Sequence, residues 1–174
     1  MVRTPKQLDQ NGLMAFAAQA LSARALTISE LREKLKRRAM DASDVDEVLA
    51  RLKESGYLND KRFADSYASW RRDDGGFGKT RVMRDLMARR VAPAVAIQAA
   101  EAAFEGADEV AMIEKFLARK YRGKDLGALL QEEKYLASAY RKLRTSGFST
   151  GNSVKVLKRY VAQAELLEDT EEES

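Results

Sequence analysis

Residues 27–56 read TISELREKLKRRAMDASDVDEVLARLKESG, and this stretch decides the fold class. Leu31 and Leu35 lie four residues apart, which is the spacing of apolar side chains on one face of an α-helix. Thr27 and Ser29 place hydroxyl groups where the first backbone N–H groups of that helix need acceptors. The pattern therefore predicts a short amphipathic helix with a defined start.

A second helix follows within the same stretch. Asp41 or Ser43 can cap its start, and Gly56 suits the position just beyond its end. Its apolar positions again recur at helical spacing, which predicts a buried stripe. The stripe consists of Val45, Val48, Leu49 and Leu52.

The same pattern recurs along the chain. An amphipathic helix at residues 13–21 completes a first three-helix unit, and a shift of 51 positions superimposes its apolar positions on a second unit. A third copy spans the helix at 108–121, a longer helix at 125–143 and a capped helix after Phe148. The aligned pairs of the first two copies are Leu31 with Val82, Leu35 with Leu86, Met40 with Val91, Val45 with Ala96 and Val48 with Ala99.

These observations predict an all-α fold in which three tandem three-helix repeats stack into an elongated, curved molecule. One such unit is too small to bury a sufficient core by itself, so stacking is the physical reason for repetition. We expect a disordered lead-in at residues 1–10 and an acidic tail at 168–174. The predicted repeats are 11–58, 59–106 and 107–167.

The composition argues against an enzyme. The chain has no cysteine and no histidine, which removes the thiol nucleophile, the thiolate metal ligand and the commonest general base. We therefore expect no catalytic residue, no metal site and no cofactor. The absence of cysteine fits a reducing cytoplasm, and no apolar run approaches the length of a membrane span. We expect a cytoplasmic protein that does not cross a membrane.

Two acidic pairs are the best remaining candidates for chemistry. Asp73 with Asp74, and Asp44 with Asp46, can in principle hold a cation or share a proton. Each pair lies beside a turn or a helix start, where capping accounts for it. We interpret both pairs as structural.

Basic residues form the candidate binding surface. The chain carries 31 Lys and Arg against 27 Asp and Glu, a net charge of +4, and acidic residues are concentrated at its C-terminal end. Cations recur at related places in the first two repeats, which favours binding to a phosphate backbone over a merely solvated helix surface. The candidate residues are Arg24, Arg32, Lys36, Arg37, Arg38, Arg71, Arg72, Lys79, Arg81, Arg84, Arg89 and Arg90.

Aromatic side chains near the join of the first two repeats have two interpretations. Tyr57, Tyr67 and Trp70 can stack on nucleic-acid bases, but their spacing beside Phe63 is typical of core packing. We interpret them as packing residues.

Four segments stand out along the chain: RALTISELREKL at 24–35, LKESGYLNDKRFA at 52–64, GKTRVMRDL at 78–86 and LRTSGF at 143–148. These segments, in this order, resemble the RecX family of recombinase regulators. The resemblance covers roughly residues 13–161. Two positions depart from the family pattern: Asn59 replaces an aspartate, and Ala39-Met40 replaces the glycine-aromatic pair that Gly147-Phe148 keeps.

The resemblance implies a function and a partner. A RecX-like protein is expected to lie in the groove of the RecA filament on single-stranded DNA and to inhibit its recombinase and co-protease activities in DNA repair. We expect a monomer that makes little sequence-specific contact with DNA. A helical DNA-binding protein that uses a helix-turn-helix-like unit is the alternative, and a scaffold for another protein is a further one. The residues first expected at the contact are Arg24, Arg32, Arg72, Lys79, Arg81 and Arg84.

Overall fold

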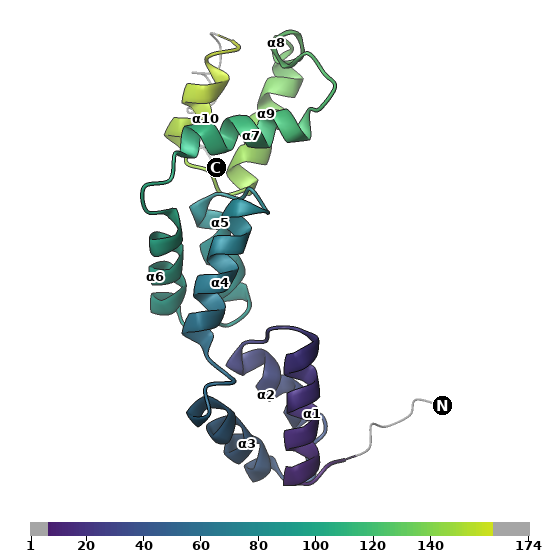
Figure 1. The fold of residues 1–174 in the computed structure, drawn as a ribbon. Helices are drawn as coiled ribbons and strands as arrows, with labels where there is room; N and C mark the ends of the chain where they lie inside the picture. The colour runs from purple at the N-terminus through teal and green to yellow at the C-terminus, as the bar shows by residue number, and fades with distance from the viewer. Residues whose placement is uncertain (1–6, 162–174) are drawn as a thin grey trace, which may run out of the picture. The chain divides into compact units, whose positions relative to one another are not determined.

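The structure is a computed structural model, and it describes residues 7–161. All regular secondary structure in this range is helical (Figure 1), which confirms the predicted all-α class of three-helix repeats. The chain forms two compact units: residues up to 67 together with 85–99, and residues 68–84 together with those from 100 onward. The residues of the second repeat are therefore shared between the two units.

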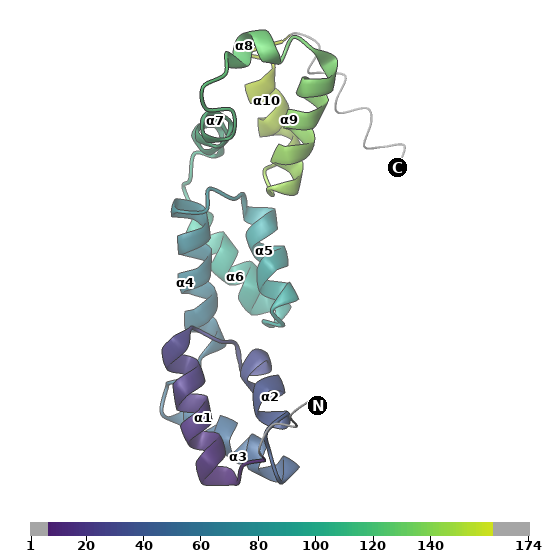
Figure 2. The same ribbon diagram turned by 90° about the vertical axis from the view of Figure 1, so that its right-hand side faces the viewer.

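The first repeat lies wholly in the first unit. It consists of α1 (Gln10–Ala23), α2 (Ile28–Lys36) and α3 (Ala42–Glu54), which pack on one another around a single core (Figure 2). Leu13, Leu31, Leu35 and Val48 have no exposed surface in that core. The apolar stripes read from the sequence are thus the buried faces of these helices.

Side-chain caps fix the helix starts in the first repeat. Thr27 accepts a hydrogen bond from the backbone N–H of Glu30, whose side chain accepts one from the N–H of Thr27, so the two residues form a capping box. Asp41 caps α3 by accepting from the N–H of Ser43. Gly56 has a φ of 73°, a left-handed conformation that glycine adopts without steric cost.

The second repeat consists of α4 (Asp60–Asp73), α5 (Lys79–Ala88) and α6 (Pro93–Phe104). Asn59 caps α4 by accepting a hydrogen bond of 2.9 Å from the N–H of Arg62, so this departure from the family pattern keeps the capping function. Val82, Leu86, Val91 and Ala96 are buried, as the repeat alignment predicts.

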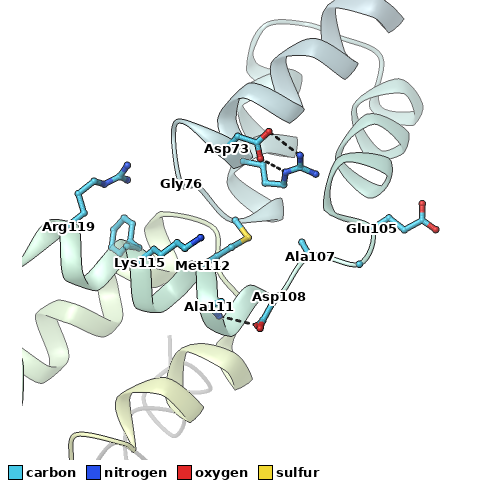
Figure 3. Close-up of a pocket in the computed structure, with 12 residues that line it drawn as sticks. Asp73, Gly76, Glu105, Ala107, Asp108, Ala111, Met112, Lys115 and Arg119 are labelled. Carbon is cyan, nitrogen blue, oxygen red and sulfur yellow. Dashed lines mark hydrogen bonds and ion pairs between the residues drawn. The ribbon is translucent and has the colours of Figure 1, made fainter.

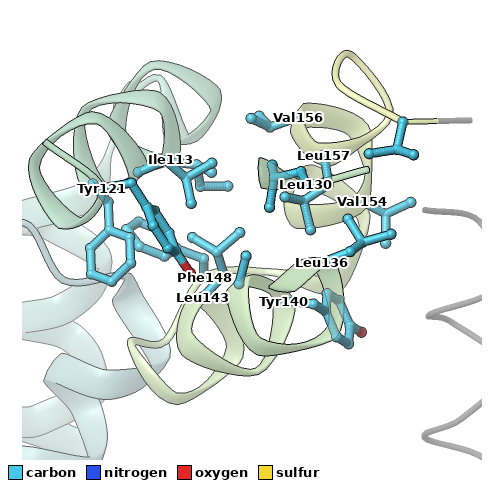
Figure 4. Packing of buried hydrophobic residues seen from close by; sticks show 14 residues of the cluster. Ile113, Tyr121, Leu130, Leu136, Tyr140, Leu143, Phe148, Val154, Val156 and Leu157 are labelled. Atoms are coloured by element: carbon cyan, nitrogen blue, oxygen red, sulfur yellow. The ribbon is translucent and has the colours of Figure 1, made fainter. Parts of the chain in front are cut away.

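The third repeat lies in the second unit. It comprises α7 (Glu109–Lys120), α8 (Leu126–Leu129), α9 (Glu133–Thr145) and α10 (Thr150–Leu157). The predicted single helix at 125–143 is wrong, because the chain breaks between α8 and α9 at residues 130–132. Leu130 is fully buried at this break and joins the core around Phe148 (Figure 4). Burial of this side chain decides the local path against a continuous helix.

Several side chains expected to be buried are exposed. Tyr57 is 73% and Trp70 52% exposed, so the packing interpretation is wrong for both, whereas Tyr67 is partly buried and stacks on Phe63. Two further large apolar side chains, Met87 in α5 and Ile97 in α6, are exposed at the surface. Helical spacing identifies the apolar face of an element but not how much of that face a neighbour covers.

In each repeat, the C-terminal end of one helix, α2, α5 or α9, accepts a hydrogen bond from a segment that precedes it in the sequence. The carbonyl of Arg38, after α2, accepts from the N–H of Leu8. The carbonyl of Arg89, after α5, accepts from the hydroxyl of Thr27 at 3.0 Å. The carbonyl of Ser146, after α9, accepts from the N–H of Gly78 at 2.9 Å. Each otherwise unsatisfied carbonyl thus gains a partner.

The predicted lead-in and tail lie largely beyond these helices. Residues 1–6 and the whole predicted acidic tail lie outside the described residues. Within the lead-in, Leu8 pairs with Ala39 in an isolated bridge and Asp9 caps α1. The predicted repeat boundaries themselves stay predictions.

Candidate partner-binding surface

Arg89 holds the junction between the first and second repeats inside the first unit. Its guanidinium donates hydrogen bonds of 2.9 Å from Nε and Nη2 to the two carboxylate oxygens of Glu30. The same guanidinium lies 4.4 Å from the centroid of the Phe63 ring and 5.6 Å from that of Tyr67. Both members of the ion pair are only 23% exposed. Arg89 is therefore a structural residue and not a free binding cation.

This junction also sets the charge state of two carboxylates. Burial works to raise the pKa of Glu30, but hydrogen bonds from Arg89 and from the N–H of Thr27, with the charge of Arg89, hold that pKa below its ordinary value. Burial raises the pKa of Asp60, and the nearby Glu30 adds to the rise, although Asp60 accepts a hydrogen bond from the N–H of Ile28. Glu30 is therefore stabilised as the anion that Arg89 requires.

Arg81 and Arg84 serve the corresponding junction in the second unit. Both donate to the carbonyl oxygen of Thr145 at the end of α9, each at 3.3 Å. The backbones come close beside them: a Cβ added to Gly147 would meet the backbone nitrogen of Arg81 at 2.2 Å. These two arginines therefore stabilise a helix end as well as carrying charge.

Most other predicted cations have a carboxylate or an aromatic partner. Arg32 pairs with Asp46, Arg72 with Asp73, Lys79 with Glu101 and Arg90 with Glu33. Arg38 lies over the ring of Phe16, and Arg71 lies over Trp70 and Phe77. One member of each acidic pair, Asp46 or Asp73, is thus an ion-pair partner, whereas the capping role expected near Asp44 belongs to Asp41 at the start of α3.

A basic depression in the first unit brings four predicted residues together. It has a volume of about 310 Å³, and Arg24, Arg37, Arg89 and Arg90 line it. Lys34 also lines it, so five cations face two carboxylates, those of Glu30 and Glu33. Both carboxylates already have arginine partners. Within residues 7–161, the side chains of Arg24 and Arg37 form no ion pair or hydrogen bond, although the charge of Arg24 contributes to the lowered pKa of Glu30.

A second depression, in the second unit, is electrostatically mixed (Figure 3). It has a volume of about 530 Å³ and combines Arg72, Lys115 and Arg119 with Asp73, Glu105 and Asp108. Asp73 is held by Arg72, and Asp108 caps α7 by accepting from the N–H of Ala111. In the described part of the chain, no three His, Cys, Asp or Glu residues gather as a metal site requires. This depression shows no arrangement suited to catalysis.

Comparison with known proteins adds the family. Residues 14–52 match the family model described as "RecX, first three-helix domain", and residues 59–99 match "RecX, second three-helix domain". The chain is 36% identical over 154 residues to "Regulatory protein RecX" of Deinococcus radiodurans, an alignment that covers 87% of this chain and 70% of the relative. This chain belongs to the RecX family. It is also 30% identical to the Amycolatopsis mediterranei RecX over 86% of this chain and 85% of that protein.

Solved RecX structures share the fold. The crystal structure of RecX from Lactobacillus salivarius aligns with a TM-score of 0.61 at 20% identity, over 90% of this chain and 97% of that one. A second crystal structure of a regulatory protein RecX aligns with a TM-score of 0.69 at 21% identity, over 86% and 73% of the two chains. RecX is a family of regulatory proteins, and no helix within residues 7–161 of this member is both long and apolar enough to span a bilayer.

Sequence reasoning missed one group of cations in this RecX chain. Arg119, Lys120, Arg141 and Lys142 line a third depression, in the second unit, with a volume of about 570 Å³. Each pair lies near the C-terminal end of its helix, where basic residues are ordinary partners of the helix dipole. The signal in the sequence was the repetition of adjacent basic residues in α7 and α9. Only the fold shows that the two pairs line the same depression.

Proposed function

We propose that this chain binds the RecA nucleoprotein filament on single-stranded DNA and lowers its recombinase and co-protease activities. Membership of the RecX family is the observation that carries the proposal, since relatives of 30% identity or more are named regulatory proteins. The absence of a catalytic arrangement in the described residues fits a protein that acts by binding. On this proposal it works in the cytoplasm, as a monomer, without an enzymatic activity of its own.

The basic depression of the first unit is the proposed contact with the filament. Arg24 and Arg37 are exposed and form no ion pair or side-chain hydrogen bond within the described residues, so they break no such contact on meeting an anionic partner. Arg90 is 69% exposed and held only by a 3.8 Å ion pair with Glu33. By contrast, Arg89, Arg81 and Arg84 already serve the junctions, so reversal of their charge would disturb folding before binding.

Recombinase ATP hydrolysis on single-stranded DNA tests this proposal. Increasing amounts of the chain are expected to lower the rate of hydrolysis, and the double variant Arg24→Glu/Arg37→Glu is expected to need about tenfold more protein for the same inhibition. The matched control is Arg51→Glu/Lys53→Glu, which makes the same charge change at exposed positions of α3 outside the depression.

Three outcomes would overturn the proposal or its assigned contact. Undiminished ATP hydrolysis at saturating amounts of a folded protein would remove the recombinase as its partner. Tight, sequence-specific binding to duplex DNA without recombinase would favour a helix-turn-helix-like DNA-binding protein instead. Equal inhibition by both double variants would show that the contact with the filament lies outside the basic depression.

A further inference from the structure

The third-repeat groove, lined by Arg119, Lys120, Arg141 and Lys142, differs from the other depressions in its charge balance. Its lining contains no carboxylate. Within residues 7–161, none of the four cations forms an ion pair. The groove therefore concentrates positive charge that the described fold does not neutralise.

The partners of two of these cations are neutral groups that orient them. Arg119 donates from Nη2 to the carbonyl of Gly75 at 2.9 Å, and Lys142 donates to the hydroxyl of Tyr121 at 3.2 Å. A carbonyl or a phenol positions a cation without cancelling its charge. Lys120 and Arg141 are exposed and form no hydrogen bond through their side chains within the described residues. The groove thus contains two cations whose positions are fixed by hydrogen bonds and two whose side chains are not held by any hydrogen bond of the described residues.

The lining favours a phosphate backbone over an acidic protein segment. An amphipathic helix docks by burying apolar side chains in an apolar groove, but no aliphatic side chain lines this one. Its two aromatic rings are already engaged. Phe116 is 9% exposed and packs edge-on against Phe148, and Phe77 has the guanidinium groups of Arg71 and Arg81 over its ring.

We propose that this groove binds the phosphate backbone of single-stranded DNA, directly and without the recombinase. Because no aromatic face is free for base stacking, the contact is made to phosphates and does not depend on base sequence. A hollow of about 570 Å³ lined by four cations offers the kind of positively charged groove that follows the backbone of a single strand. The site lies outside the proposed RecA contact, and it gives the chain a second, independent hold on a filament that contains DNA.

The salt dependence of binding provides a quantitative test. A single strand releases about 0.7 counterions for each phosphate neutralised, so removing two contacts should reduce the slope of log K against log salt by about 1.4. The measurement is fluorescence anisotropy of a labelled oligothymidylate with the full chain alone. Lys120→Ala/Arg141→Ala should weaken binding and flatten the slope. Lys120→Arg/Arg141→Lys should restore both.

The control is Lys124→Ala/Lys155→Ala, which removes two exposed cations of the same repeat outside the groove. Equal affinities and slopes for the two alanine double variants would overturn the proposal. A second measurement uses polyglutamate in place of the oligonucleotide. If polyglutamate binds the chain more tightly than the oligonucleotide does, and Lys120→Ala/Arg141→Ala abolishes that binding, the groove is a site for an acidic protein and the proposal is overturned. No recombinase is present, so the outcome is independent of the inhibition experiment.

Discussion

Arg89 and Arg90 are neighbours in the chain and differ completely in their surroundings. Arg89 is held by Glu30 and two aromatic rings, with 23% of its side chain exposed, whereas Arg90 is 69% exposed and lies 3.8 Å from Glu33. A charge that loses its partner away from water is costly, while an exposed ion pair contributes little. Two residues with the same chemistry thus have different functions.

Substitution of these neighbours separates the two functions. Arg89→Ala leaves the Glu30 carboxylate without its main partner and should lower the free energy of unfolding by about 2–4 kcal/mol. Arg90→Ala should change it by less than about 1 kcal/mol. Urea unfolding followed by circular dichroism measures both. Equal losses in the two variants would contradict the structural assignment of Arg89.

The pKa of Glu30 predicts a pH dependence for this junction. A carboxyl group with a lowered pKa in the folded state stabilises the fold above its ordinary value of about 4.5, and that contribution is lost as the pH falls through the folded pKa. Glu30→Gln should therefore destabilise the chain at pH 7 and lose its effect in acid. Asp60, whose pKa is raised, acts in the opposite direction in both proteins. Urea unfolding at pH 7 and at successively lower pH values tests the difference, and a constant gap between the two proteins would contradict it.

The second helices of the repeats meet their neighbours through the same kind of end contact. At one junction the start of α2 meets the end of α5, and at the other the start of α5 meets the end of α9. A helix start carries partial positive charge and a helix end partial negative charge, so each contact is favourable. At the contact between α5 and α9, the backbone of Gly147 lies so close to that of Arg81 that a side chain at position 147 would clash with it.

Gly147 is the position where this close approach can be tested. It has a φ of 89°, and a Cβ there would meet the backbone of Arg81. Gly147→Ala should therefore cost more than about 2 kcal/mol, through both strain and displacement of α5. Gly151, in α10, has open space around it, so Gly151→Ala should stabilise the helix by up to about 1 kcal/mol. Thermal unfolding measures the two shifts, and a neutral Gly147→Ala would show that the contact can relax.

For the chain as a whole, residue patterns over a few positions were enough to predict the helices. The surroundings of the candidate binding residues depend instead on partners that are distant in the sequence. The helices, their caps at Thr27, Asp41 and Asn59, and the alignment of repeats follow from spacing and residue type, which act over a few positions. The ion pair of Arg89 was not foreseen, because its partner Glu30 lies 59 residues away in the sequence. The cations of α7 and α9 were missed for the same reason, since each pair alone resembles an ordinary helix end.

Met40 and Phe148 show why equivalent positions of a repeat need not have equal burial. Phe148 is fully buried, whereas Met40 is 66% exposed. The aligned residue of the second repeat, Val91, is buried as well, so only the first repeat leaves this position exposed. What a repeat position contacts depends on its place in the array, which the alignment of copies does not encode.

The pairing of Leu8 with Ala39 has a consequence for assembly. Leu8 bonds to the backbone of Arg38 and Met40, at the end of α2, where each later repeat receives the start of a preceding helix. That docking position is therefore already occupied by the chain's own backbone. A second copy that docked at the end of α2 would therefore first have to break the two backbone hydrogen bonds of Leu8.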